Sequence, residues 1–199
     1  TSDTIRLSEI NWKTTSTMMR SKIHTGLVFQ VPSTIPEILV GLVVRVANRG
    51  AVLFGSFFAL NEPFDWTSFD RIVKSESPIW SHQYFSTGLV DGRWRAIGDW
   101  HGFKFEEWPL PLFYSDLNPA SLLARRYSDN GDFDIESQWT IASNEVSEMV
   151  EDGISEYLGV EAELESRVEI VRFGGVLKPG LARYRQVPYG IKNADFVGS

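Results

Sequence analysis

The side chains best suited to acid–base chemistry are Asp99, His101 and the neighbouring pair Glu106 and Glu107. Histidine is the residue most easily tuned to titrate near neutral pH. Adjacent carboxylates such as Glu106 and Glu107 point to opposite faces of a strand, however, and no residue pattern nearby indicates a nucleophile. The chain also lacks a Gly-x-Ser-x-Gly elbow, a phosphate-binding loop and a Gly-x-Gly-x-x-Gly turn. We therefore expect no enzyme and no catalytic residue.

A second candidate is a metal site in the run 129–136, Asp-Asn-Gly-Asp-Phe-Asp-Ile-Glu, which is dense in the hard oxygen ligands that calcium prefers. Its glycine comes too early for an EF-hand loop, so a turn at Asn130-Gly131 between two strands is the favoured interpretation. The three histidines share no short spacing, and the absence of cysteine excludes disulfides, cysteine-ligated zinc and thiol nucleophiles. We expect neither a metal ion nor a cofactor.

Charge is distributed very unevenly along the chain. Segment 128–169, called the acidic segment below, holds 13 Asp and Glu against a single basic residue, Arg167. The chain has 26 acidic and 19 basic residues in all, which leaves 13 acids and 18 bases outside the segment, or −12 against +5. Such a field attracts a cationic partner and repels nucleic acid and anionic membranes. The plainer interpretation is a solvated face that keeps the protein soluble.

We predict that part of the acidic segment is the contact surface for a cationic protein partner. Alternate acids between 129 and 136 would share one face of a strand, and acids between 145 and 152 would share one face of a helix. Close charge pairs across such an interface contribute about 1.5–7 kcal/mol and raise the association rate. The predicted contact residues are Asp129, Asp132, Asp134, Glu136, Glu145, Glu148 and Asp152.

Aromatic residues gather in segment 61–108, which offers an alternative function. Exposed rings would stack on the faces of a sugar, although burial in a core is the ordinary use of such side chains. The alternative hypothesis is a small-molecule or carbohydrate-binding module that uses this segment. Its tryptophans are Trp66, Trp80, Trp94, Trp100 and Trp108.

The local patterns predict an α+β fold. Two long apolar runs on either side of the triplet Asn48-Arg49-Gly50 indicate a hairpin that is covered on both faces. Asp65 is a suitable N-cap for a short helix that ends near Val73. We expect a curled, mainly antiparallel β-sheet that forms a partial barrel, with two or three packed helices. The main expected strands are 28–31, 38–47, 51–60 and 94–97, with further strands near 110–114 and 132–142 and helices at 144–151 and 161–171.

One domain with two flanking segments is the expected organisation. Residues 1–25 are an N-terminal arm, residues 26–173 form a single α+β domain, and residues 174–199 form a basic tail. The bases of the tail are thinly spread and the net charge is −7, which argues against nucleic-acid binding. No run of 18 or more apolar residues exists to span a membrane. These features favour a cytoplasmic protein without a nucleic-acid or membrane partner.

The order of several short motifs resembles that of a known family. A first strand, Gly26-x-Val28-Phe-x-Val31-Pro32, precedes the hairpin, and a second, Gly92-Arg-Trp94-x-x-Ile97-Gly98, follows it. Then come Trp108-Pro-Leu-Pro111-Leu-Phe113 and a helix start, Gly153-Ile…Val160-Glu-Ala-Glu-Leu164. Over residues 26–170 the chain is similar to the immunity protein 26 family of bacterial polymorphic toxin systems.

This resemblance implies a cytoplasmic protein that binds one cognate toxin domain and neutralises it by covering its active site or substrate groove. It implies no catalysis, no cofactor and no fixed set of binding residues, because such interfaces diverge with their toxins. Together with the acidic segment, it predicts a toxin that has a basic surface, such as a nuclease.

Overall fold

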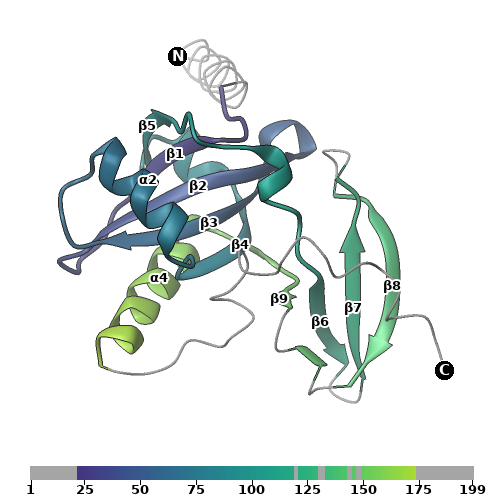
Figure 1. The fold of residues 1–199 in the computed structure, drawn as a ribbon. Coiled ribbons are helices and arrows are strands. Elements are labelled where there is room, and N and C mark those ends of the chain that lie inside the picture. Colours follow the sequence, from purple (N-terminus) through teal and green to yellow (C-terminus); the bar gives the residue numbers. More distant parts are fainter. Residues whose placement is uncertain (1–21, 119–120, 130–132, 143–144, 147–148, 174–199) are drawn as a thin grey trace, which may run out of the picture.

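The computed structural model describes residues 22–118, 121–129, 133–142, 145–146 and 149–173 (Figure 1). Within this part of the chain, two β-sheets and three α-helices form an α+β fold, and neither sheet closes into a barrel. The predicted fold class is therefore confirmed, with the correction that the strands are divided between two sheets. Most of the predicted N-terminal arm and all of the predicted basic tail lie outside the described residues.

The first sheet has six strands in the order β10-β4-β3-β2-β1-β5. Its centre is the predicted hairpin of β2 and β3, and the connecting residues Asn48–Gly50 have positive φ angles of 49, 54 and 85°. Such angles suit a tight connection between two antiparallel strands. The strands are β1 (Leu27–Val31), β2 (Ile38–Ala47), β3 (Val52–Leu60), β4 (Trp80–Phe85), β5 (Arg95–Asp99) and the short β10 (Ile154–Ser155).

The second sheet has the order β8-β7-β6-β9, and Figure 1 shows it standing beside the first sheet. Its three long strands are antiparallel neighbours, whereas β9 runs parallel to β6. The strand β10, which follows β9 closely, runs parallel to β4 of the first sheet. Segment 150–155 therefore ties one sheet to the other. The strands are β6 (Phe113–Asn118), β7 (Ser121–Tyr127), β8 (Ile135–Ile141) and β9 (Val150–Glu151).

A single large core includes residues of both sheets and of the last helix. Phe113 of β6 and Val150 of β9 belong to the same buried cluster as the central hairpin. Helix α4 (Tyr157–Arg172) adds Val160, Leu164 and Val168 to that cluster, so it packs against the sheets with one side. A smaller cluster on the second sheet surrounds Ala124, Ile141 and Met149.

The three helices were predicted with unequal success. Helix α2 (Trp66–Ser75) begins as predicted, because the Asp65 carboxylate accepts hydrogen bonds from the backbone N–H groups of Thr67 and Ser68, both at 2.9 Å. Helix α4 covers the whole of the predicted helix 161–171. The four-residue helix α3 (Thr87–Val90) had no sequence prediction.

The prediction of a helix at 144–151 is wrong. Its last two residues form strand β9, and the described residues 145–146 form only a short 3-10 turn. The apolar stripe on which that prediction rested is used differently, because Val146 and Met149 cover the small cluster on the second sheet while Val150 pairs with Phe113. Contacts distant in sequence thus override the local helical spacing.

Two glycines have opposite surroundings and give a test of the packing. A Cβ atom at Gly41 of β2 would lie 2.1 Å from the ring of Phe29, which is fully buried, whereas a Cβ atom at Gly159 of α4 meets nothing within 4 Å. We expect Gly41→Ala to lower the free energy of unfolding by at least about 2 kcal/mol through overpacking.

The same change on the helix, Gly159→Ala, should raise the free energy of unfolding by about 0.5–1 kcal/mol, because glycine in a helix costs backbone entropy. Urea unfolding of the two variants measures both effects. If Gly41→Ala is as stable as the parent chain, the close approach of Phe29 to β2 is wrong.

Candidate functional site

Asp152 of the acidic segment turns inward and joins the two sheets. Its side chain is only 7% exposed, and its carboxylate accepts hydrogen bonds from Arg125 Nη1 at 2.5 Å and from the Tyr127 hydroxyl at 2.9 Å. The Gln83 amide of β4 lies 3.5 Å away, at the limit of a hydrogen bond. Burial, together with the Asp152 charge, raises the pKa of Tyr127 to about 12, so this hydroxyl stays protonated and donates.

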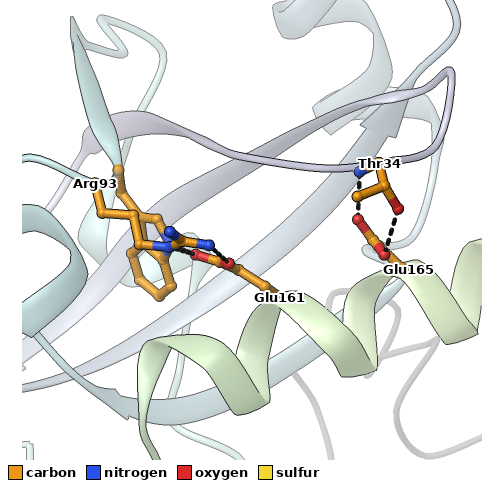
Figure 2. A network of polar contacts seen from close by, with 5 residues as sticks. Thr34, Arg93, Glu161 and Glu165 are labelled. Carbon is orange, nitrogen blue, oxygen red and sulfur yellow. Dashed lines mark hydrogen bonds and ion pairs between the residues drawn. The ribbon is translucent and has the colours of Figure 1, made fainter.

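Helix α4 also directs acids toward the first sheet (Figure 2). The buried Glu161 carboxylate accepts hydrogen bonds from the Arg93 guanidinium at 2.6 and 2.5 Å and from the Trp94 indole N–H at 2.8 Å. One turn further, the Glu165 carboxylate accepts from the backbone N–H of Thr34 at 2.5 Å and from its hydroxyl at 2.9 Å. The hydrogen bond to Glu161 raises the pKa of Arg93. These acids hold the helix in place.

A third inward acid is Asp129, which follows β7. It forms a bidentate ion pair with Arg45 of β2, at 2.5 and 2.9 Å. Arg45 is only 3% exposed, and its guanidinium lies 3.5 Å from the centroid of the Phe105 ring. The Asp129 side chain remains 43% exposed, so it is shared between the fold and the surface. This pair attaches the far end of the second sheet to the first.

The exposed acids Glu151, Glu156 and Glu169 lie in or beside β9 and α4, and another group of outward-facing acids lies around strand β8. Asp134 directly precedes the strand and Glu136 is its second residue, and both are exposed. Glu145 follows the strand after four residues and is exposed, although its carboxylate accepts a hydrogen bond from the backbone N–H of Ala142 at 2.6 Å. Of the other predicted contact residues, Asp132 and Glu148 lie outside the described residues. The structure therefore separates Asp152 from the exposed acids with which it was grouped.

The basic partners of these acids were not predicted from the sequence. Arg45 interrupts the otherwise apolar run of β2, and a charge within a strand covered on both faces needs a buried counter-charge. That signal was available in the sequence. Arg93, before β5, and Arg125, in β7, do not interrupt an apolar run in this way. Most of the residues around them are exposed or partly exposed, so their sequence gives no sign of a buried partner.

A cavity of about 320 Å³ lies beside the β4–β10 edge of the first sheet and is partly lined by α4. The Trp80 and His82 rings stack inside it with centroids 4.4 Å apart, and His82 Nε2 lies 2.8 Å from the Ser155 hydroxyl. The Arg167 guanidinium lies 5.2 Å from the Trp80 centroid, and its Nε is 2.7 Å from a Glu163 oxygen. Arg167 and Glu163, one turn apart on α4, therefore form an ion pair at the wall of the cavity.

The Ser155–His82 contact is not an activated nucleophile. Burial and the nearby Arg167 charge lower the pKa of His82 to about 4, which makes it a weak base at neutral pH. Among the described side chains, no carboxylate hydrogen-bonds to the His82 ring to orient it. In the acid–base group considered from the sequence, Asp99 lies 3.3 Å from His24, Glu107 pairs with Lys104 at 2.9 Å, and His101 is exposed to solvent.

The aromatic side chains of segment 61–108 are mainly core residues. Trp80, Trp94, Trp100 and Trp108 are between 0 and 6% exposed, whereas Trp66, at 41%, and Phe105, at 39%, have a substantial exposed surface. A sugar-binding platform needs several exposed rings, so this placement removes the basis of the carbohydrate alternative. The described residues also contain no group of three or more His, Asp or Glu side chains that would hold a metal ion.

The chain matches no protein-family model, no curated protein and no solved structure, so its similarity to the immunity protein 26 family stays a prediction. No helix in the described part of the chain has the length and apolar character required to cross a membrane.

Loss of the buried carboxylate of α4 tests its anchoring role. Glu161→Ala leaves the buried indole N–H of Trp94 without its partner, and we expect the free energy of unfolding to fall by about 2 kcal/mol. Glu169→Ala, the same change at an exposed position of the same helix, should alter it by no more than about 0.5 kcal/mol. Equal effects in chemical denaturation would show that Glu161 does not anchor the helix.

The lowered pKa of His82 predicts a pH dependence of stability. The folded state keeps His82 neutral down to a pKa of about 4, whereas the unfolded chain takes up a proton below a pKa of 6.5. We therefore expect stability to fall by about 3 kcal/mol as the pH drops from 6.5 to 4, with no further loss from this group at lower pH. His82→Gln should remove this component. An unchanged slope of unfolding free energy against pH in that variant would contradict the assignment.

Proposed function

We propose that the chain is a stoichiometric protein inhibitor: an immunity protein that binds a cognate bacterial toxin domain and covers its active site or substrate groove. The observation that carries this proposal is the placement of the exposed acids Asp134, Glu136 and Glu145 around a single strand, β8. A toxin that acts on nucleic acid has a cationic groove, and such a groove is complementary to this surface.

The division between inward and outward acids supports a binding role. Asp152 and Glu161 lie in buried contacts that hold the fold together, so the negative field available to a partner comes from the remaining acids. Exposed charges of this kind act mainly on the rate of association and on its salt dependence. The similarity to the immunity protein 26 family points to the same class of function, which needs no cofactor, nucleic acid or membrane.

The alternative, a small-molecule or carbohydrate-binding module, has weaker support. The tryptophans of segment 61–108 are mostly buried. In the cavity beside β4, the lining guanidinium of Arg167 is already paired with the Glu163 carboxylate and lies over the Trp80 ring. No specific observation favours a ligand there over the inhibitor.

The test begins with the protein encoded beside this chain. Co-expression should restore the growth of cells that the neighbouring protein alone arrests, and the two proteins should purify as a complex of defined stoichiometry. Failure to protect these cells, although both proteins are produced, would contradict the proposal.

Charge reversal then locates the binding surface. We expect the double variant Asp134→Lys and Glu136→Lys to associate with the toxin at least about tenfold more slowly at low salt, with a smaller difference at high salt. Glu169→Lys, at an exposed position of α4, is the matched control and should retain the parent rate. Stopped-flow rates that are equal for all three proteins would exclude the β8 region as the contact surface.

A further inference from the structure

Within the described part of the chain the two sheets have four edge strands, and β8 is the longest of them. The edges β9 and β10 are only two residues long. The edge β5 is interrupted by a register shift against β1, and its Gly98 has a φ of 150°. Short strands, bulges and twisted backbone are the means by which proteins protect an edge from pairing with another chain. Those three edges are protected in this sense.

Strand β8 also has a register shift against β7, at Glu136, but its residues 137–141 pair with β7 without interruption. It spans seven residues, and within the described part of the chain it pairs only with β7. Six of its seven residues are exposed or partly exposed. Its sequence, IESQWTI, contains no proline and no lysine and is rich in β-branched and aromatic residues. Figure 1 shows β8 on the outer side of the second sheet, away from the first sheet. Half of its backbone N–H and C=O groups therefore point away from β7.

The side chains of β8 divide into two faces. Gln138 and Thr140 share one face, and Gln138 accepts a hydrogen bond from Arg125 there at 2.9 Å. Ser137, Trp139 and Ile141 share the other face, and Glu136 is the extra residue at the register shift between Ser137 and Ile135. A strand added to this edge would place one set of alternate side chains beside Gln138 and the other beside Trp139, with its end next to Glu136.

We propose that an extended segment of the toxin adds to the outer edge of β8 as a fifth strand, with Lys or Arg side chains on the Gln138 face and toward Glu136 at the end of the strand, and apolar side chains on the Trp139 face. This inference rests on the proposed inhibitor function and specifies how its partner binds. The backbone hydrogen bonds of the added strand provide affinity, and the alternating side chains provide specificity.

Charge decides between a basic partner and a second copy of this chain. Pairing of two β8 strands would bring together two acidic segments, in a protein whose net charge is −7. A basic segment instead meets Asp134 before the strand, Glu136 within it and Glu145 after it. Opposite charges on neighbouring strands stabilise the pair, and like charges destabilise it.

The chain contains no cysteine, so single cysteines introduced into it give unambiguous cross-links. Ser137→Cys places a thiol on the apolar face of β8, and Ser166→Cys, at an exposed position of α4, is the matched control. The probe is a synthetic eight-residue peptide of alternating Lys and Val with one Cys moved through its positions. We expect disulfide formation with Ser137→Cys only when the peptide Cys replaces a Val, and none above background with Ser166→Cys.

Hydrogen exchange of the unmodified full chain gives a second measurement. The Lys–Val peptide at millimolar concentration should slow exchange of the β8 amides at least about tenfold, and an alternating Glu–Val peptide should not. Absence of protection in β8, or a cross-linking pattern without alternation, would overturn the proposal. A Ser137→Cys disulfide between two copies, with a mass twice that of one chain before any peptide is added, would also overturn it in favour of self-association.

The growth assay separates this proposal from the proposed function. Full protection of cells by a chain whose β8 amides exchange equally fast in the free protein and in the toxin complex would remove strand addition and leave the inhibitor intact. Protection of the β8 amides by the peptide, in a chain that fails to rescue growth, would remove the inhibitor function and leave the edge as a strand-binding site.

Discussion

The burial of one carboxylate, Asp152, is the constraint on which the arrangement of the two sheets depends. A carboxylate that is only 7% exposed is stable only if charged or polar partners surround it. Arg125 and Tyr127 of β7 provide those partners, and the backbone N–H of Asp152 donates to the Tyr114 carbonyl of β6 at 2.6 Å. The residues on either side continue into β9 of the second sheet and β10 of the first. Asp152 therefore helps to fix how the sheets meet, together with their shared core and the Arg45–Asp129 pair.

The same logic explains how the chain tolerates its acidic segment. Glu161 and Asp129 each find an arginine of an element that precedes the segment, Arg93 and Arg45 respectively. Such pairs convert a local excess of charge into contacts between elements that are distant in sequence. Of the acids left at the surface, Asp134, Glu136 and Glu145 lie near β8, whereas Glu151, Glu156 and Glu169 lie in or beside β9 and α4. Fewer acids therefore face a partner than the sequence alone indicates.

Much of the fold could be predicted from the sequence where the signal is local. The β2–β3 hairpin has a turn triplet between two apolar runs, and Asp65 is placed to cap α2, so both elements were located correctly. Strand β4 was not predicted. Five of its six residues are buried, on both faces of the strand, so its sequence shows no alternation of apolar and polar residues. The helix predicted at 144–151 failed for another reason: its apolar spacing serves the second sheet.

The candidate site was less predictable than the fold. Strand alternation correctly placed Glu136 on an exposed strand, but whether an acid faces inward depends on which arginine it meets, and that is a property of the tertiary structure. Asp152 looked like an exposed helical residue because its spacing from Glu145 suits a helix. The absence of a helix there leaves Asp152 in a connection between two strands, where it is buried.

A double-mutant cycle on Arg125 and Asp152 tests most directly whether inward acids of this segment hold the two sheets together. Arg125→Ala, Asp152→Ala and the double variant are compared by chemical denaturation, with the exposed pair Lys104 and Glu107 as the control cycle. The structure predicts a coupling free energy of about 1–3 kcal/mol for the buried pair and a much smaller one for the control. Additive effects, within about 0.5 kcal/mol, would contradict the central role of Asp152.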